Sequence, residues 1–217
     1  MKQREGFTLM ELLVASVIFS FVIAALVTIS STAHRHMFQS HRSNTVKTGV
    51  LLGMRAIQNN LSVATRLDVP GVGVQGDILA FAVNADQTTG CYPVGPGNVV
   101  AHYFCISNNI LYHHAITIAG NSAPACSAMT APGNPFTAAR YPTFCGPGGG
   151  GTVTLLTRDV SPLPTLFSRR NGDGVYEMDT VMIRLRSLWS ATATATDATA
   201  RDVDFSMNTV VKINRAQ

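Results

Sequence analysis

One acidic residue stands inside a long apolar stretch near the start of this 217-residue chain. The stretch begins at Phe7 and runs to Ile29, and Glu11 is its only charged residue. A carboxylate inside a membrane-length helix is energetically costly and needs a partner. The chemistry that Glu11 predicts is therefore pairing with a positive charge.

Four cysteines follow the apolar stretch, and none belongs to a C-x-x-C pair, which weakens a zinc interpretation. An even number of cysteines in a translocated domain fits two disulfides, for which three pairings exist. We favour sequential pairing, which closes short local loops and joins Cys91 to Cys105 and Cys126 to Cys145. Four free buried thiols are the better interpretation if the domain is cytosolic.

Two other groups of residues resemble metal ligands. Three histidines follow the apolar stretch at His34, His36 and His41. They have no carboxylate nearby, so we favour a solvated basic collar near lipid headgroups over a metal site. Part of a calcium loop is suggested by Asn171, Asp173 and Glu177. This segment lacks the alternating oxygens of a full site, and we interpret it as a tight turn.

Motifs of common catalytic centres are absent from the sequence, including G-x-S-x-G, H-E-x-x-H and the P-loop. One G-x-G-x-x-G string, at residues 71–76, follows a predicted helix and precedes a strand, the wrong order for dinucleotide binding. The net charge of +4 is too small and scattered to predict nucleic-acid binding by itself. We therefore predict a protein that is not an enzyme and uses no cofactor or metal.

The element that carries Glu11 is long enough to cross a membrane. Its 23 apolar residues, at about 1.5 Å per residue, match a bilayer core of about 30 Å. No signal-peptidase-like A-x-A site follows it. Lys2 and Arg4 precede the stretch and favour a cytoplasmic N-terminus. The sequence thus predicts a single span, with residues 30–217 outside the cytoplasm.

The same helix is predicted to continue into the rest of the chain. Apolar residues spaced by three or four lie at Val46, Val50, Met54, Ile57, Leu61 and Ala64. This spacing is one face of an amphipathic helix. No proline interrupts residues 1–69, so we expect a helix from Phe7 to about Arg66. Whether its polar join at residues 30–44 bends or frays stays open.

Alternating and short apolar runs after Pro70 predict strands. We expect them at Ile78–Val83, Val99–Ile106, Ile110–Ile118, Val153–Thr157, Val175–Leu188 and Asp202–Asn214, with loops at residues 119–151 and 190–200. Asn108 and Asn109 suit a two-residue hairpin turn, because asparagine tolerates positive φ. This turn would place Cys105 opposite Tyr112 and Tyr103 opposite His114, with His113 on the other side of the sheet from His114. The fold class is α+β, with a long helix packed on an antiparallel sheet.

The string Gly6-Phe7-Thr8-Leu9-Met10-Glu11 lies between a short charged leader and an unbroken apolar helix. In this setting it resembles the N-terminus of type IV prepilins. The resemblance implies that a prepilin peptidase cleaves between Gly6 and Phe7 and that the new amine of Phe7 is methylated. It also implies that Glu11 meets the N-terminal amine of a neighbouring subunit during assembly. The alternative is that Glu11 only reaches back to the cytoplasmic interface.

The resemblance divides the chain into a leader (1–6), a transmembrane half-helix (7–29), an extracytoplasmic amphipathic half-helix (30–69) and a β-rich head (70–217). It implies a single-pass inner-membrane protein with a periplasmic head, later part of a pilus or pseudopilus. Weaker similarities to minor pilins and J-type or W-type minor pseudopilins lie in residues 53–61, in residues 76–79 and in the closing strand.

The implied function is to assemble into, prime or cap a pilus or a type II secretion pseudopilus. The implied partners are other pilin or pseudopilin subunits, the prepilin peptidase and the inner-membrane assembly platform. Two alternatives remain: a DNA-uptake or adhesive pilin, and a membrane-anchored extracytoplasmic enzyme.

Overall fold

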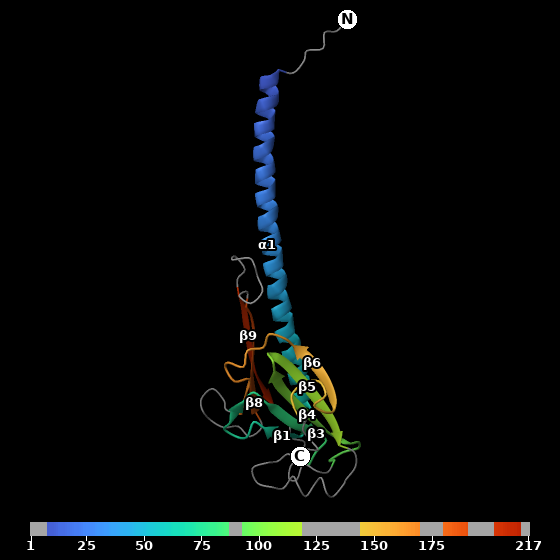
Figure 1. Ribbon diagram of the computed structural model, residues 1–217. Helices are drawn as coiled ribbons and strands as arrows, with labels where there is room; N and C mark the ends of the chain where they lie inside the picture. The colour runs from blue at the N-terminus through green and yellow to red at the C-terminus, as the bar shows by residue number, and fades with distance from the viewer. Residues whose placement is uncertain (1–7, 87–92, 119–143, 170–179, 191–201, 214–217) are drawn as a thin grey trace.

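One long helix carries a β-rich head at its C-terminal end in the computed structural model (Figure 1). The N-terminal part of this helix, α1 (Leu9–Ser62), extends away from the head. The expected α+β fold is confirmed: one long N-terminal helix packs against antiparallel β-sheets. The structure describes residues 8–86, 93–118, 144–169, 180–190 and 202–213.

Helix α1 is continuous over 54 residues, including the polar join at residues 30–44. At about 1.5 Å per residue it is about 80 Å long. It ends earlier than expected, with Val63 as its C-cap, so the predicted helical end between residues 66 and 69 is wrong. Arg66–Val69 instead forms strand β1, which pairs with β3 (Leu79–Val83). Pairing with another strand satisfies the backbone of this segment better than an isolated helix end would.

Two antiparallel sheets form the head. The first has the order β1-β3-β4-β5-β6, in which the last three strands are β4 (Val99–Ser107), β5 (Ile110–Ile118) and β6 (Thr152–Thr157). The second has the order β2-β7-β8-β9, formed by β2 (Gln75–Gly76), β7 (Phe167–Ser168), β8 (Thr180–Trp189) and β9 (Val203–Lys212). The predicted strands are found where the chain is described, whereas β1, β2 and β7 were not predicted because they are too short to show alternation.

The β4–β5 hairpin has the register that its turn residues predict. Asn108 and Asn109 have φ of 51° and 59°, the left-handed values that a two-residue turn of this kind requires. Cys105 pairs with Tyr112 and Tyr103 pairs with His114, as expected. Adjacent histidines on β5 consequently point to opposite faces of the sheet.

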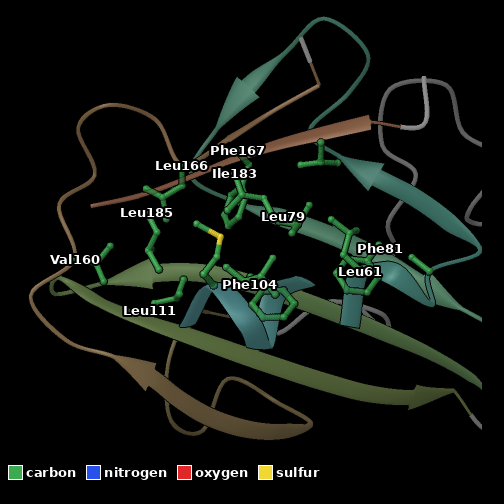
Figure 2. Packing of buried hydrophobic residues seen from close by; sticks show 14 of the residues in the cluster. Leu61, Leu79, Phe81, Phe104, Leu111, Val160, Leu166, Phe167, Ile183 and Leu185 are labelled. Atoms are coloured by element: carbon green, nitrogen blue, oxygen red, sulfur yellow. The ribbon is translucent and has the colours of Figure 1, made fainter. Parts of the chain in front are cut away.

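The core lies between the C-terminal half of α1 and both sheets (Figure 2). The helix buries the face that the sequence predicts, with Val50, Met54, Ile57, Leu61 and Val46. The two sheets meet this face with large side chains such as Phe81, Phe104, Phe167, Ile183 and Leu185. Burying these apolar side chains is the main stabilising contribution of the head.

Two glycines bring the helix close to strand β6. A Cβ atom added at Gly49 would lie 2.5 Å from Oγ1 of Thr157, and one added at Gly53 would lie 3.3 Å from its Cγ2. The two glycines are four residues apart, so they share one helix face. The buried Thr157 side chain therefore packs against both glycines.

Candidate functional site

The N-terminal half of α1 is an apolar surface that the rest of the described chain does not cover. Its most apolar 18-residue window has a mean hydropathy of 2.8, and none of it is buried. Large side chains such as Leu9 and Phe21 are 84% and 72% exposed. An exposed apolar surface of this size in one chain requires lipid or other chains around it. This half of the helix is the first candidate site.

Glu11 lies at the start of this surface and closes the end of its own helix. Its Oε2 accepts hydrogen bonds from the backbone N–H of Thr8 (3.0 Å) and from Oγ1 of Thr8 (3.1 Å). The backbone N–H of Glu11 in turn donates to Oγ1 of Thr8 at 3.3 Å. This reciprocal arrangement is a capping box, which satisfies N–H groups that a helix start otherwise leaves free.

The sequence interpretation of Glu11 missed this local role. The sequence does carry a signal for this capping role: the spacing Thr8-x-x-Glu11 is typical of a capping box. The carboxylate therefore has an intramolecular partner in the single chain. The predicted cleavage site at Gly6 and Phe7 lies outside the described residues.

The hydroxyl groups in the apolar half of α1 are also satisfied within the helix. Ser16 donates to the carbonyl of Leu13, and Ser20 donates to that of Ser16, both at 2.8 Å. Thr28 donates to the carbonyl of Ala24. Side chains that bond to their own helix do not need water, so these residues are compatible with a hydrocarbon environment.

The three histidines of the predicted collar, His34, His36 and His41, are exposed on α1. Among the described residues, the metal-ligand side chains that lie close enough together to share an ion are those of Cys105, His114 and Cys145, so these three histidines form no such group. Near them the helix contacts the head: the guanidinium of Arg42 lies 4.4 Å from the ring centroid of Trp189, at the end of β8. This cation–π contact ties the middle of α1 to the second sheet.

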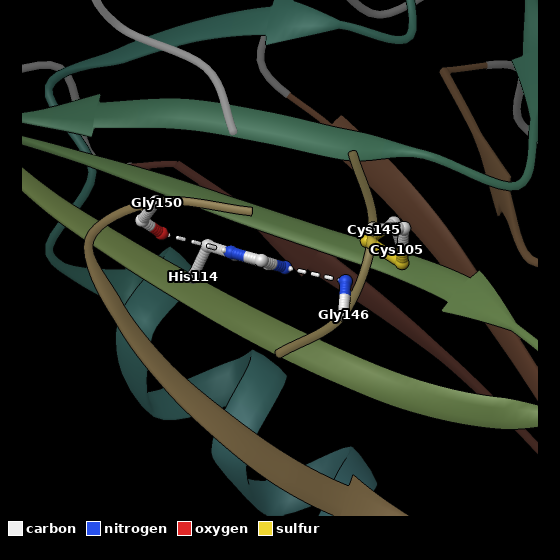
Figure 3. The surroundings of a disulfide bond; sticks show 5 residues. All are labelled: Cys105, His114, Cys145, Gly146 and Gly150. Carbon is white, nitrogen blue, oxygen red and sulfur yellow. Dashed lines mark hydrogen bonds between the residues drawn. A yellow bond between two sulfur atoms is a disulfide. The ribbon is translucent and has the colours of Figure 1, made fainter. Parts of the chain in front are cut away.

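The cysteines do not pair sequentially. Cys105 is bonded to Cys145, forty residues later, so the expected pairing of Cys105 with Cys91 and of Cys145 with Cys126 is wrong. The physical reason lies in the tertiary structure. Cys105 on β4 and His114 on β5 lie on the same face of the sheet, and residues 144–151 cover that face, which brings Cys145 next to Cys105 (Figure 3). Cys91 and Cys126 lie outside the described residues.

His114 fastens the covering segment beside the disulfide (Figure 3). Its ring is fully buried. Nδ1 is 3.1 Å from the carbonyl oxygen of Gly150, and Nε2 accepts the backbone N–H of Gly146 at 3.1 Å. The two contacts assign the proton to Nδ1, because a carbonyl can only accept. The expectation of a satisfied strand histidine is confirmed for His114.

The other face of the same strands carries a pair of hydrogen-bonded imidazoles. Nδ1 of His102 lies 2.8 Å from Nε2 of His113. The ring of His102 stacks on Phe81 and that of His113 stacks on Phe104. Burial, together with the charges of neighbouring histidines, lowers the pKa of His113 to about 4, and burial also lowers the pKa of His102. Both rings are therefore neutral near pH 7.

The three predicted calcium-loop residues, Asn171, Asp173 and Glu177, lie outside the described residues. Of the loop predicted at residues 190–200, only Ser190 lies within the described residues.

One comparison with known proteins matches the N-terminal part of the chain. A family model described as the prokaryotic N-terminal methylation motif matches residues 1–27. No curated protein matches the chain. Among solved structures, a type IV-like pilin, TTHA1219 from Thermus thermophilus, is 12% identical with a TM-score of 0.34, over 77% of this chain and 96% of that chain. That likeness is too low to show a shared fold.

The chain carries the prokaryotic N-terminal methylation motif, and in the structure this motif leads into a long helix that is exposed in its first half and packs on antiparallel sheets in its second half. The apolar half of α1 is long and apolar enough to cross a membrane.

Proposed function

We propose that the protein is a minor pilin or pseudopilin subunit, whose helix α1 anchors it in the inner membrane and then joins a helical bundle of subunits. The supporting observation is the contrast within α1. Its C-terminal half packs into the head, whereas its apolar N-terminal half has no cover among the described residues. A filament core of such half-helices would cover that surface without changing the head.

Glu11 has a specific part in this proposal. In the single chain its carboxylate is bonded by Thr8, which lowers the cost of holding it in the membrane before assembly. On assembly, the methylated amine of Phe7 from a neighbouring subunit would take over the carboxylate. Two opposite charges attract strongly in a low-dielectric bundle, so this pair would set the axial register between subunits.

The capping and charge-pairing roles of Glu11 can be separated by substitution. Glu11→Gln removes the charge but keeps the cap, because glutamine also serves at this position of a capping box. Thr8→Ala weakens the cap but keeps the charge. Both variants should insert and be cleaved. We expect Glu11→Gln to be depleted from sheared filament or pseudopilus fractions and Thr8→Ala to be retained.

The measurement is the ratio of processed chain in the filament fraction to that in the membrane fraction, by immunoblot. If Glu11→Gln and the unchanged chain enter the filament fraction equally, the charge-pairing role of Glu11 is refuted. Processing is checked separately by mass spectrometry of the chain purified after co-expression with a prepilin peptidase. The expected product has lost residues 1–6 and gained one methyl group at Phe7, and a bulky Gly6→Val variant should stay uncleaved.

The DNA-binding alternative requires a clustered basic surface. Within the described part of the head, the outer face of β8 carries Arg184 and Arg186, and Asp204 pairs with Arg186 through two hydrogen bonds. This pair neutralises one of the two cations. This pairing counts against a clustered basic surface at β8. The system that the subunit serves would follow from co-purification with other pilin-like chains.

A further inference from the structure

We propose that the reduced form of this chain binds one Zn²⁺ ion through the thiolates of Cys105 and Cys145 and through Nε2 of His114. The three ligand atoms already lie within 4.8 Å of one another. Tetrahedral zinc, with Zn–S of about 2.3 Å and Zn–N of about 2.0 Å, places its ligand atoms roughly 3.3–3.8 Å apart. The site therefore forms only when the two sulfurs, which are 2.04 Å apart in the disulfide, separate.

One ring nitrogen of His114 already has the kind of partner that metal-binding histidines commonly have. Metal-binding histidines commonly donate their second ring N–H to a backbone carbonyl, which fixes the tautomer and the ring orientation. Here Nδ1–H donates to the carbonyl of Gly150. Nε2 is therefore the unprotonated nitrogen, and its lone pair faces the segment of Cys145 and Gly146 (Figure 3). At present this electron pair accepts the N–H of Gly146, which zinc would displace.

Burial of the site favours a metal complex without net charge once the disulfide is open. Cys105 and His114 are buried, and a pair of thiolates without a counter-ion would be strongly disfavoured there. Zn²⁺ with two thiolates and a neutral imidazole has no net charge. Three protein ligands leave a fourth coordination position for water.

The chemistry makes metal and disulfide mutually exclusive. A two-electron reductant of the dithiol class transfers two electrons and two protons to the Cys105–Cys145 disulfide, giving two thiols, while the reductant forms its own disulfide. Zinc binding then releases the two thiol protons. The oxidised chain has no thiolate to offer, so the site exists only before the disulfide forms or after it is reduced.

The test uses the full chain in detergent micelles, with Cys91→Ser and Cys126→Ser to remove the other thiols. A phosphine reduces the disulfide, taking up an oxygen atom from water to become the phosphine oxide. The probe is Co²⁺, followed by competition with Zn²⁺. We expect one Co²⁺ per reduced chain, with thiolate-to-cobalt charge-transfer and tetrahedral ligand-field absorption, and none on the oxidised chain.

Two substitutions on neighbouring positions of β5 make the assignment specific. His114→Gln should weaken zinc affinity by more than about 10-fold, a loss that removing an outer-shell partner alone already produces. His113→Gln, on the opposite face of the strand, should leave the affinity unchanged. Equal binding by the oxidised chain, or an equal affinity for the His114→Gln variant, would overturn the proposal.

Because His114 is buried, its variant needs a companion measurement that does not depend on folding. X-ray absorption of the zinc-loaded chain with His114 intact should show two sulfur ligands and an imidazole. A zinc shell without sulfur, or one without imidazole, would overturn the proposal independently of any histidine variant.

Discussion

Gly49 is predicted to be required by the packing of α1 on β6, although glycine is unfavourable inside a helix. Replacing it with alanine should gain up to about 1 kcal/mol of helix propensity. The new Cβ would lie 2.5 Å from Oγ1 of the buried Thr157, about 1 Å closer than an ordinary contact. Overpacking of this kind costs typically about 1–3 kcal/mol. We expect Gly49→Ala to destabilise the chain by up to about 2 kcal/mol.

The same substitution should change sign once Thr157 is shortened. In Gly49→Ala the added Cβ lies 3.6 Å from Cβ of Thr157, an ordinary contact that remains in Thr157→Ala. With Oγ1 gone, Gly49→Ala should stabilise the Thr157→Ala chain by up to about 1 kcal/mol. The coupling free energy between the two sites is therefore about 1–3 kcal/mol.

A double-mutant cycle measures this coupling, using denaturant unfolding of the full chain in detergent followed by circular dichroism. Thr48→Ala, at the adjacent exposed position, is the control for helix propensity alone. If Gly49→Ala stabilises the unchanged chain, or has the same effect in both backgrounds, α1 does not approach β6 as described.

The lowered pKa of His113 predicts that stability falls with acidification, because between about pH 6.5 and pH 4 the unfolded chain binds a proton that the folded chain does not. The loss should be on the order of 2–3 kcal/mol, measured as unfolding free energy against pH, and a His113→Phe variant that keeps the full slope would contradict it. Asn109→Gly should stabilise the hairpin by about 0.5–1 kcal/mol in thermal unfolding, since Asn-Gly is the favoured pair for a two-residue turn with positive φ, here 59° at Asn109, and a lower melting temperature would oppose this. Arg42→Gln should change the fluorescence of Trp189 and cost about 0.5–1 kcal/mol, whereas an unchanged spectrum would mean that the cation–π contact is absent in solution.

Features encoded by neighbouring residues were predicted well. The apolar run and the spacing from Val46 to Leu61 gave both halves of α1, because helix periodicity is a local property. The Asn108-Asn109 turn gave the β4–β5 register residue by residue, because a two-residue turn fixes the pairing on both sides. The methylation motif is likewise continuous in sequence.

Features that join distant segments depended on the tertiary structure. Sequence proximity favoured the wrong partner for Cys105, since the partner was chosen by the segment that covers β4 and β5. The end of α1 was set by pairing of β1 with β3, which competes with helix propensity. Gly49 reads in the sequence as a weak point of the helix, and only its contact with Thr157 shows why a larger residue does not fit.

The sequence by itself determined the features from which we propose an anchor. The methylation motif and the apolar run of α1 are continuous in sequence, so no fold is needed to recognise them. The tertiary structure decided which distant residues of the head contact one another. Examples are the Cys105–Cys145 disulfide and the hydrogen bonds of His114 to Gly146 and Gly150. The physical reason is that long-range pairing depends on which surfaces pack together, and packing is a property of the whole chain.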